Sequence, residues 1–256
     1  MAARKPEGPP PPPTVQRLRL RYAKRGRLRF SSHRDFQRAF ERALRRAEIP
    51  MAYSAGFSPH PKVSYANAVP TGVASEAEYV EIGLAQVCDP DRVRVALDES
   101  LPPGLDVLEV VVAGPGALAD RLDASVFEIR LPGVDPATAH VAVDTFLGRT
   151  EVEVQRMTKN GIRTFDARAA VTSLTVRADD TVGGSMSNLG DPDGCAILRL
   201  VVRHTTPAVR TDDVLSALRQ VADLAPPVPA QVTRLAQGPL GAAESEVADP
   251  LVPDRA

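Results

Sequence analysis

The chain has 256 residues, of which 43% are hydrophobic and 25% charged, and its formal net charge is −1. These values are ordinary for a globular protein with one large or two small domains. No apolar run approaches the ~18 residues that span a bilayer, and the N-terminus lacks the apolar segment of a secretory signal. We therefore expect a cytoplasmic protein that does not contact a membrane.

The two cysteines and the distribution of charge narrow the function classes further. Cys88 and Cys195 are far apart, which excludes a disulfide framework and a cysteine-rich metal site within this chain. Residues 1–65 contain 15 Lys and Arg against 4 Asp and Glu, and the remainder contains 16 basic and 28 acidic residues. A basic first quarter predicts a polyanion or an acidic partner surface bound there.

The first half of the chain predicts a β-α-β-β-α-β order. After a proline-rich segment at residues 1–16, expected to be disordered or polyproline II, arginines alternate with apolar residues from Arg17 to Lys24, which predicts a half-buried strand. The remaining elements expected here are a helix ended by Pro50, strands over residues 51–57 and 77–85, a helix that begins at Pro90 after Asp89, and a strand over residues 105–114.

The clearest element is the helix after Ser32. Apolar residues recur at helical spacing from Phe36 to Ala47, Ser32 is a good N-cap, and Asp35 follows three residues later. The opposite face carries arginines at four-residue steps. We expect this helix to present a ridge of guanidinium groups to solvent.

The second half repeats the same order. We expect a strand over residues 124–133, a helix capped by Asp135, a hairpin that turns at Asn160–Gly161, a loop over residues 180–194, a strand over residues 195–206, a helix capped at Thr211, and a strand over residues 230–240. The predicted fold class is α+β. It comprises two tandem ferredoxin-like (βαββαβ) units packed into one body, at residues 17–116 and 117–240, with a disordered acidic tail at residues 241–256.

Two stretches resemble a bacterial family. The run from Arg27 to Leu84, which contains "SSHRDFQRAFERALRRAEIP" and "GFSPHPKVSYANAVPTG", resembles the signature of the uncharacterised radical-SAM-associated (radical-SAM-linked) proteins, and "MTKNGIRTFDARAAV" resembles their second signature. The resemblance covers roughly residues 17–240. It implies a stand-alone member that acts with a separate radical-SAM enzyme or an E/G-type ribonuclease. The chain has no C-x-x-x-C-x-x-C motif for an iron–sulfur cluster, so we expect no cofactor.

Three groups of residues are candidates for phosphate or RNA binding. They are Arg34, Arg38, Arg42 and Arg45 on the arginine-rich helix; His60 and Lys62 in the loop Gly56–Gly72; and Lys159, Arg163 and Arg168 near the predicted hairpin. Guanidinium groups bind phosphate bidentately, and long loops in compact units are often functional. Each group also has a plain structural interpretation: a solvated helix face, a rigid spacer, and a salt-bridged turn.

The leading functional hypothesis is a non-catalytic protein that binds or presents RNA, either tRNA or rRNA, during RNA maturation or modification. One alternative is an RNA-cleaving or RNA-modifying enzyme with His33 or His60 as general acid–base. Another is a protein–protein scaffold with a basic docking face. A metal site is not expected, because these histidines lack the spacing and the companion ligands that a metal requires.

Overall fold

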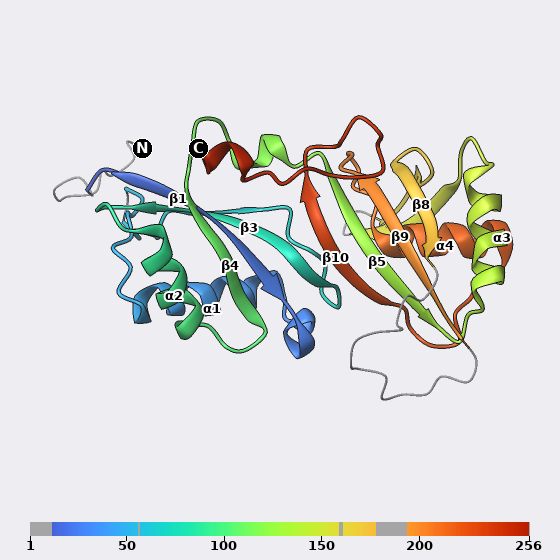
Figure 1. Ribbon diagram of the computed structural model, residues 1–256, viewed down its shortest axis with the longest axis horizontal. Helices are drawn as coiled ribbons and strands as arrows, with labels where there is room; N and C mark the ends of the chain where they lie inside the picture. Colours follow the sequence, from blue (N-terminus) through green and yellow to red (C-terminus); the bar gives the residue numbers. More distant parts are fainter. Residues whose placement is uncertain (1–11, 56, 159–160, 178–193, 256) are drawn as a thin grey trace. The chain divides into compact units, whose positions relative to one another are not determined.

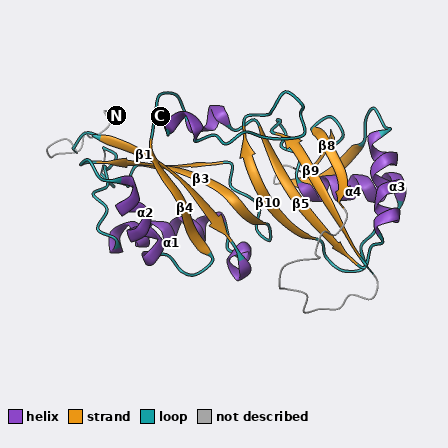
Figure 2. Ribbon diagram, in the orientation of Figure 1, coloured by secondary structure: helices purple, strands orange, loops and turns teal. Residues whose placement is uncertain are grey.

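The computed structural model describes residues 12–55, 57–158, 161–177 and 194–255. The chain divides into two compact units: unit 1 comprises Met1–Arg121 and Pro250–Ala256, and unit 2 comprises Leu122–Asp249. Unit 2 is therefore inserted in the sequence of unit 1. The described residues contain four α-helices and antiparallel strand pairings, which confirms the predicted α+β class (Figures 1 and 2).

Unit 1 is a sheet covered on one face by two helices. Its elements are β1 (Gln16–Lys24), the 3-10 helix η1 (Gly26–Phe30), α1 (His33–Arg46), β2 (Val63–Ala66), β3 (Ala74–Leu84), α2 (Pro90–Ser100), β4 (Leu105–Val112) and the 3-10 helices η2 (Leu118–Arg121) and η3 (Val252–Asp254). The strand order is β4-β1-β3-β2. Helices α1 and α2 lie on one face of this sheet (Figure 1).

The core of unit 1 fills the space between the helices and the sheet. Leu18 and Leu20 of β1 are fully buried there, as is Leu97 of α2, and Phe36 and Phe40 of α1 are at most 3% exposed. Successive side chains of a strand point to opposite faces. Arg17, Arg19 and Arg21 of β1 therefore lie on the face that the helices do not cover.

One predicted strand of unit 1 is wrong. Residues 51–57 form only isolated bridges, Met51 with Leu84 and Tyr53 with Pro61, and the second strand is β2, inside the segment predicted to be a loop. Residues 51–57 do not form a continuous strand because Pro61, the partner of Tyr53, has no N–H to donate. The chain also reverses direction between Ser54 and His60.

The predicted disordered tail is also wrong for the part that the structure describes. Residues 241–255 are described, and the segment from Pro250 onward belongs to unit 1. Leu251 is fully buried, and so is the side chain of Asp254. At the other end, residues 1–11 of the predicted proline-rich segment lie outside the described residues, and Gln16 already begins β1.

Unit 2 contains a second sheet, with the order β10-β5-β9-β8, and a separate hairpin. Its elements are β5 (Ala124–Pro132), α3 (Pro136–Leu147), β6 (Glu153–Thr158), β7 (Gly161–Asp166), β8 (Val171–Arg177), β9 (Cys195–Arg203), α4 (Thr211–Ala222) and β10 (Gln231–Gly238). Helices α3 and α4 pack on each other, and α3 packs on β8 and β9. Strands β6 and β7 confirm the predicted hairpin, and Gly161 of its predicted turn begins β7. Asn160 and most of the predicted loop 180–194 lie outside the described residues.

Candidate nucleic-acid interface

Helix α1 holds the arginine ridge, which we define as Arg34, Arg38, Arg42 and Arg45. All four side chains are exposed. The helix forms as the sequence predicted, because the Ser32 hydroxyl accepts a hydrogen bond from the Asp35 N–H at 3.2 Å and so caps its first turn. Four-residue spacing keeps Arg34, Arg38 and Arg42 on one face, opposite the side chains that enter the core.

The arginine ridge is largely free of acidic partners. Arg38 lies 4.0 Å from the Asp35 carboxylate, and both side chains are more than half exposed. Arg34, Arg42 and Arg45 form no ion pair with any residue that the structure describes. The pKa of Asp35 is lowered, first by the Ser32 hydroxyl that donates to its carboxylate and then by the nearby arginines.

The arginines of β1, which the charge pattern suggested as an extension of this basic surface, have a different role. Arg17 pairs with Glu81 at 3.3 Å, and Arg19 pairs with the same carboxylate at 2.9 Å. The Arg21 side chain donates to the main-chain carbonyl of Glu76 at 2.8 Å. These three arginines link β1 to β3, and they do not form a continuous set of unpaired guanidinium groups that could bind phosphate.

Arg19 is the most deeply buried of these cations. Its side chain is fully buried and donates hydrogen bonds to the carboxylates of Glu81 and Asp254. The Asp254 carboxylate also accepts a hydrogen bond from the Arg121 guanidinium group at 2.8 Å. Burial alone would raise the pKa of Asp254, but the hydrogen bonds from Arg19, from the Gly114 N–H and from Arg121 lower it. Asp254 is therefore an ionised carboxylate held between two guanidinium groups.

Gly114 is required for this arrangement. Its N–H donates to an Asp254 carboxylate oxygen at 2.9 Å, and a Cβ added to Gly114 would lie only 2.7 Å from that same oxygen. Any larger residue at position 114 would displace the carboxylate.

Residues 57–72 of the predicted loop comprise an exposed turn and strand β2. Ser54 and His60 exchange hydrogen bonds across a short exposed turn, in which Phe57 is 70% exposed. The Lys62 ammonium donates to the Thr14 hydroxyl at 2.9 Å. His60 thus lies at the exposed turn, whereas the main chain of Lys62 is hydrogen-bonded to Gly83 of β3. Among the described residues, neither His60 nor Lys62 forms a hydrogen bond or ion pair with the arginine ridge.

The two histidine candidates are not brought together. The His33 ring packs edge-on against Tyr65, with centroids 5.1 Å apart, and its Nε2 lies 3.1 Å from the Gln37 amide. Burial, and then the charge of Glu41, raises the pKa of Tyr65. No described hydrogen bond or ring contact joins His33 to His60, so the geometry assembles no acid–base pair from them.

The candidates in unit 2 differ from one another. Lys159 lies outside the described residues, and Arg163 is exposed on β7, directly across from Arg156. Arg168 instead donates to the Val171 carbonyl at 3.0 Å and lies over the Phe146 ring, so it has a structural role. Of this group, Arg163 is the one described side chain open to a ligand.

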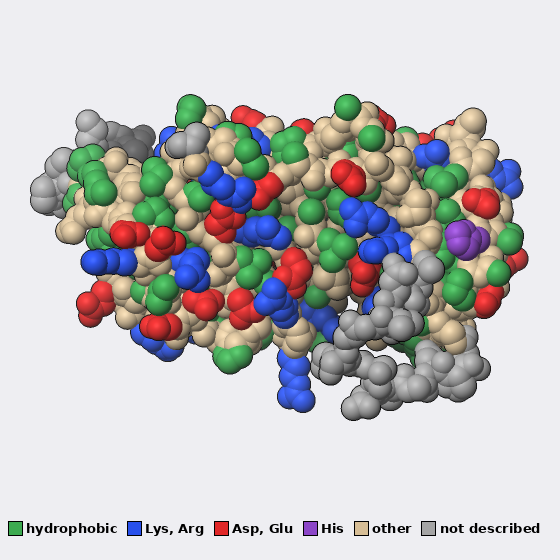
Figure 3. Space-filling model, in the orientation of Figure 1, with side chains coloured by type: hydrophobic (Ala, Val, Ile, Leu, Met, Phe, Trp, Pro, Cys, Tyr) green, Lys and Arg blue, Asp and Glu red, His purple; other side chains and the backbone are tan. Residues whose placement is uncertain are grey.

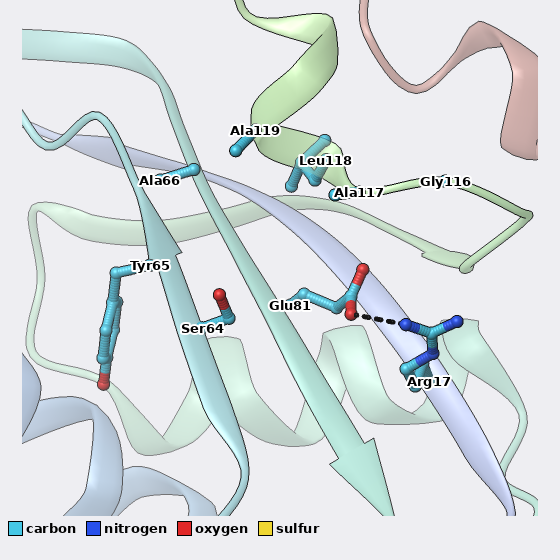
Figure 4. A pocket seen from close by; sticks show the side chains of 9 residues that line it. All are labelled: Arg17, Ser64, Tyr65, Ala66, Glu81, Gly116, Ala117, Leu118 and Ala119. Atoms are coloured by element: carbon cyan, nitrogen blue, oxygen red, sulfur yellow. Dashed lines mark hydrogen bonds and ion pairs between the residues drawn. The ribbon is translucent and has the colours of Figure 1, made fainter.

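The unit 1 sheet has a pocket on the face opposite α1 and α2, with a volume of about 380 Å³. Figure 4 shows Ser64 and Glu81 beside it, while the ring of Tyr65 points away, toward the helices. Arg17 closes one end, and Leu118 and Ala119 lie along the other side. This pocket could not be predicted from the sequence, because residues 116–119 lie beside β2 and β3 only in the folded chain.

On the face drawn in Figure 3, Lys and Arg side chains are interspersed with Asp and Glu side chains. Among the described residues no cluster of three His, Cys, Asp or Glu could hold a metal ion, and no helix there is long and apolar enough to cross a membrane.

Comparison with protein families gives one match. The model of a family described as an uncharacterized protein conserved in bacteria (DUF2344) matches residues 17–211. The chain belongs to the DUF2344 family. A comparison with curated proteins finds no match. The DUF2344 region contains every candidate residue named above, and it includes Arg19 but ends before Asp254.

Sequence reasoning missed one further polar site in this DUF2344 chain, at His204 in unit 2. Burial lowers the pKa of His204, so the neutral ring donates from Nδ1 to the Leu122 carbonyl and accepts at Nε2 from the Ser125 hydroxyl, at 2.7 and 2.8 Å. Ser125 is only 1% exposed, which makes this a structural hydrogen bond and not an accessible nucleophile. The two residues are 79 positions apart, so no local sequence pattern could have connected them.

Proposed function

We propose that the chain is a non-catalytic RNA-binding protein that presents RNA to a separate enzyme during RNA maturation or modification. One observation carries this proposal: the arginines of β1 have carboxylate or main-chain carbonyl partners, whereas those of the arginine ridge on α1 are exposed. Arginines needed only for the fold would be expected to have acidic or carbonyl partners, as Arg17, Arg19 and Arg21 do.

Several exposed arginines on one helix face can bind several phosphate groups of an RNA backbone. A guanidinium group donates two parallel hydrogen bonds to phosphate oxygens, and several such contacts release condensed counterions. Binding through the arginine ridge would therefore be strong at low salt and weak at high salt. Contacts to phosphate and to the shape of the RNA would dominate, since the exposed ring on α1, that of His33 in the first turn, already packs edge-on against Tyr65.

The strand order of both units supports ferredoxin-like topology, with β6 and β7 as an insertion in the second unit. In unit 1, however, the open sheet face is not an obvious platform for bases. Arg17 and Arg19 are bound to Glu81 there, and Asp254 covers Arg19. We therefore assign the RNA contact to the helical side of unit 1.

The partner enzyme follows from the sequence resemblance to radical-SAM-associated proteins. Since the chain has no cluster-binding cysteine motif, a radical-SAM reaction would be carried out by another polypeptide. An E/G-type ribonuclease is the other partner that the resemblance suggests. In either case the chain contributes substrate binding and not turnover.

The test is RNA binding by the full chain over a salt series, with tRNA and rRNA fragments as ligands and heparin as competitor. The variant Arg34→Glu/Arg38→Glu/Arg42→Glu should bind RNA at least about tenfold more weakly, with a smaller salt dependence, because three phosphate contacts are lost. The matched control is Arg149→Glu/Arg177→Glu/Arg219→Glu, which changes the charge equally at exposed positions of unit 2. The proposal fails if both triple variants bind alike, or if heparin displaces RNA as readily as RNA itself.

A further inference from the structure

An exposed phenylalanine immediately precedes the arginine ridge. Phe30 ends η1, and Ser31 and Ser32 join it to α1, so it lies beside the end of the helix at which the ridge begins with Arg34 (Figure 1). Phe30 is 59% exposed, and none of the residues in η1 is buried. Phe30 therefore adds to the arginine ridge an accessible aromatic face that α1 itself lacks.

The main chain that carries Phe30 is held on both sides. The Arg29 carbonyl accepts a hydrogen bond from the Gly72 N–H at 2.7 Å, and the Ser31 carbonyl accepts one from the buried Lys24 ammonium at 2.9 Å. Phe30 is thus exposed from a fixed segment and not from a loose loop. A side chain presented in this way loses little conformational entropy when a ligand binds to it.

One face of the Phe30 ring is already covered by a cation. The guanidinium carbon of Arg29 lies 4.7 Å from the ring centroid, which is a cation–π contact. With this contact in place Phe30 is still 59% exposed, so the opposite face of the ring is open to a second planar group. Nucleic-acid bases are such groups, since every base has a flat face that can stack on an aromatic ring.

The charge around Phe30 favours a polyanion. Residues 27–38 contain four arginines and one acidic residue. Arg27 is exposed, and neither Arg27 nor Arg29 forms an ion pair with a residue that the structure describes. Arg25, just before the same segment, is by contrast paired with two carboxylates. The arginines closest to Phe30 in the sequence are therefore not neutralised by the fold.

The other exposed phenylalanine lacks these features. Phe57 is 70% exposed, but the turn over residues 53–61 contains no Lys, Arg, Asp or Glu. An exposed apolar side chain is common on protein surfaces and by itself indicates no function. Phe30 differs from Phe57 because an exposed ring, a cation over that ring and arginines without ion pairs occur together.

We propose that Phe30 is a base-stacking platform, and that the RNA bound on the arginine ridge is single-stranded where it reaches η1. The phosphates bind the exposed arginines, and an unpaired base lies against the open face of Phe30 while Arg29 remains on the other face. In a duplex the bases are stacked on one another, so the platform selects an unpaired segment. This inference rests on the proposed RNA-binding function and names its substrate class.

The experiment compares the binding of one unstructured RNA oligonucleotide to the full chain, as a single strand and as the duplex with its complement. Phe30→Ala removes the platform, and Phe57→Ala is the matched control, since both changes remove an exposed ring of unit 1. Because the chain contains no Trp, Phe30→Trp and Phe57→Trp each introduce a single indole whose fluorescence a stacked base quenches. Thermal unfolding of each variant checks that it is folded.

Phe30→Ala should bind the single strand about tenfold more weakly, as expected for one lost base–aromatic stack, with no change in salt dependence because no phosphate contact is lost. Its affinity for the duplex should match that of the wild type, and so should the affinity of Phe57→Ala for either form. Phe30→Trp should keep the affinity for the single strand, which should quench its fluorescence but not that of Phe57→Trp.

The outcomes separate the platform from the arginine ridge. The variant Arg34→Glu/Arg38→Glu/Arg42→Glu should lose affinity for both forms of RNA and show a smaller salt dependence. If the wild type binds RNA through the ridge but Phe30→Ala binds the single strand equally well, the platform is wrong and the RNA-binding function stands. Unchanged fluorescence of Phe30→Trp at saturation, or an equal loss for single strand and duplex, also overturns the platform. If the wild type binds neither form, both proposals fail.

Discussion

Arg19 and Arg34 show how little the identity of a residue says about its role. Both belong to the basic first quarter of the chain, yet Arg19 is fully buried between two carboxylates and Arg34 is exposed with no described ion pair. The sequence could not separate them, because Asp254 lies 235 residues beyond Arg19. Alternation predicted correctly which face of β1 carries the arginines, but not what covers that face.

Replacing Asp254 with Asn should lower the free energy of unfolding by about 3–5 kcal/mol, because it leaves the Arg19 charge buried with one carboxylate fewer. Urea unfolding of the variant measures this loss. Asn and Asp have nearly the same size, so the loss in free energy of unfolding would result from the removed charge and not from a cavity.

The control for Asp254→Asn is Glu109→Gln, which breaks the pair that Glu109 forms with Arg255 at 2.5 Å on the exposed part of the same face. Exposed pairs contribute about 0–1 kcal/mol, so this variant should unfold nearly as the wild type does. Equal effects of the two changes would contradict a special role for the buried carboxylate.

At the scale of elements, the best predictions came from local chemistry. The start of α1 after Ser32 and of α2 after Asp89 was readable because a side chain within a few residues caps each helix. Strand β2 was missed because its four residues follow a proline-rich turn, and only their pairing with β3 makes them a strand. The same holds for the candidate site. The arginine ridge could be predicted from the spacing of residues within one helix, whereas the pocket could not, because its residues are far apart in the sequence.

The cap of α1 gives a test at this scale. Ser32→Ala removes both the acceptor for the Asp35 N–H and the donor to its carboxylate. We expect a loss of about 0.5–2 kcal/mol in the free energy of unfolding, measured by urea unfolding.

Ser32→Thr keeps the hydroxyl and should restore most of that stability. If Ser32→Thr is as unstable as Ser32→Ala, the hydroxyl is not what caps the helix.

At the scale of the whole molecule, unit 1 is discontinuous in sequence. Its β-α-β-β-α-β elements end before Arg121, yet it is completed by the segment from Pro250 onward. The predicted boundary between residues 116 and 117 lies close to this division. The return of the chain was missed because residues 241–256 are acidic and contain prolines, and so were assigned to a disordered tail.

Removing residues 250–256 should therefore weaken unit 1 in particular. Without Asp254, Arg19 and Arg121 lose their common partner, and amide hydrogen exchange in β1 and β4 should become markedly faster. Exchange in β8 and α3 of unit 2 serves as the internal reference. Unchanged protection in β1 would show that the segment is dispensable.

The separation of Arg19 from Asp254 also imposes an order in time. During synthesis Arg19 leaves the ribosome 235 residues before the carboxylate that neutralises it, and all of unit 2 is made in the interval. Domains generally fold in order from the N-terminus as they emerge, but β1 cannot bury Arg19 against Asp254 until the segment after unit 2 has been made. Unit 2 can therefore complete its fold before unit 1 does, although unit 1 begins first in the sequence.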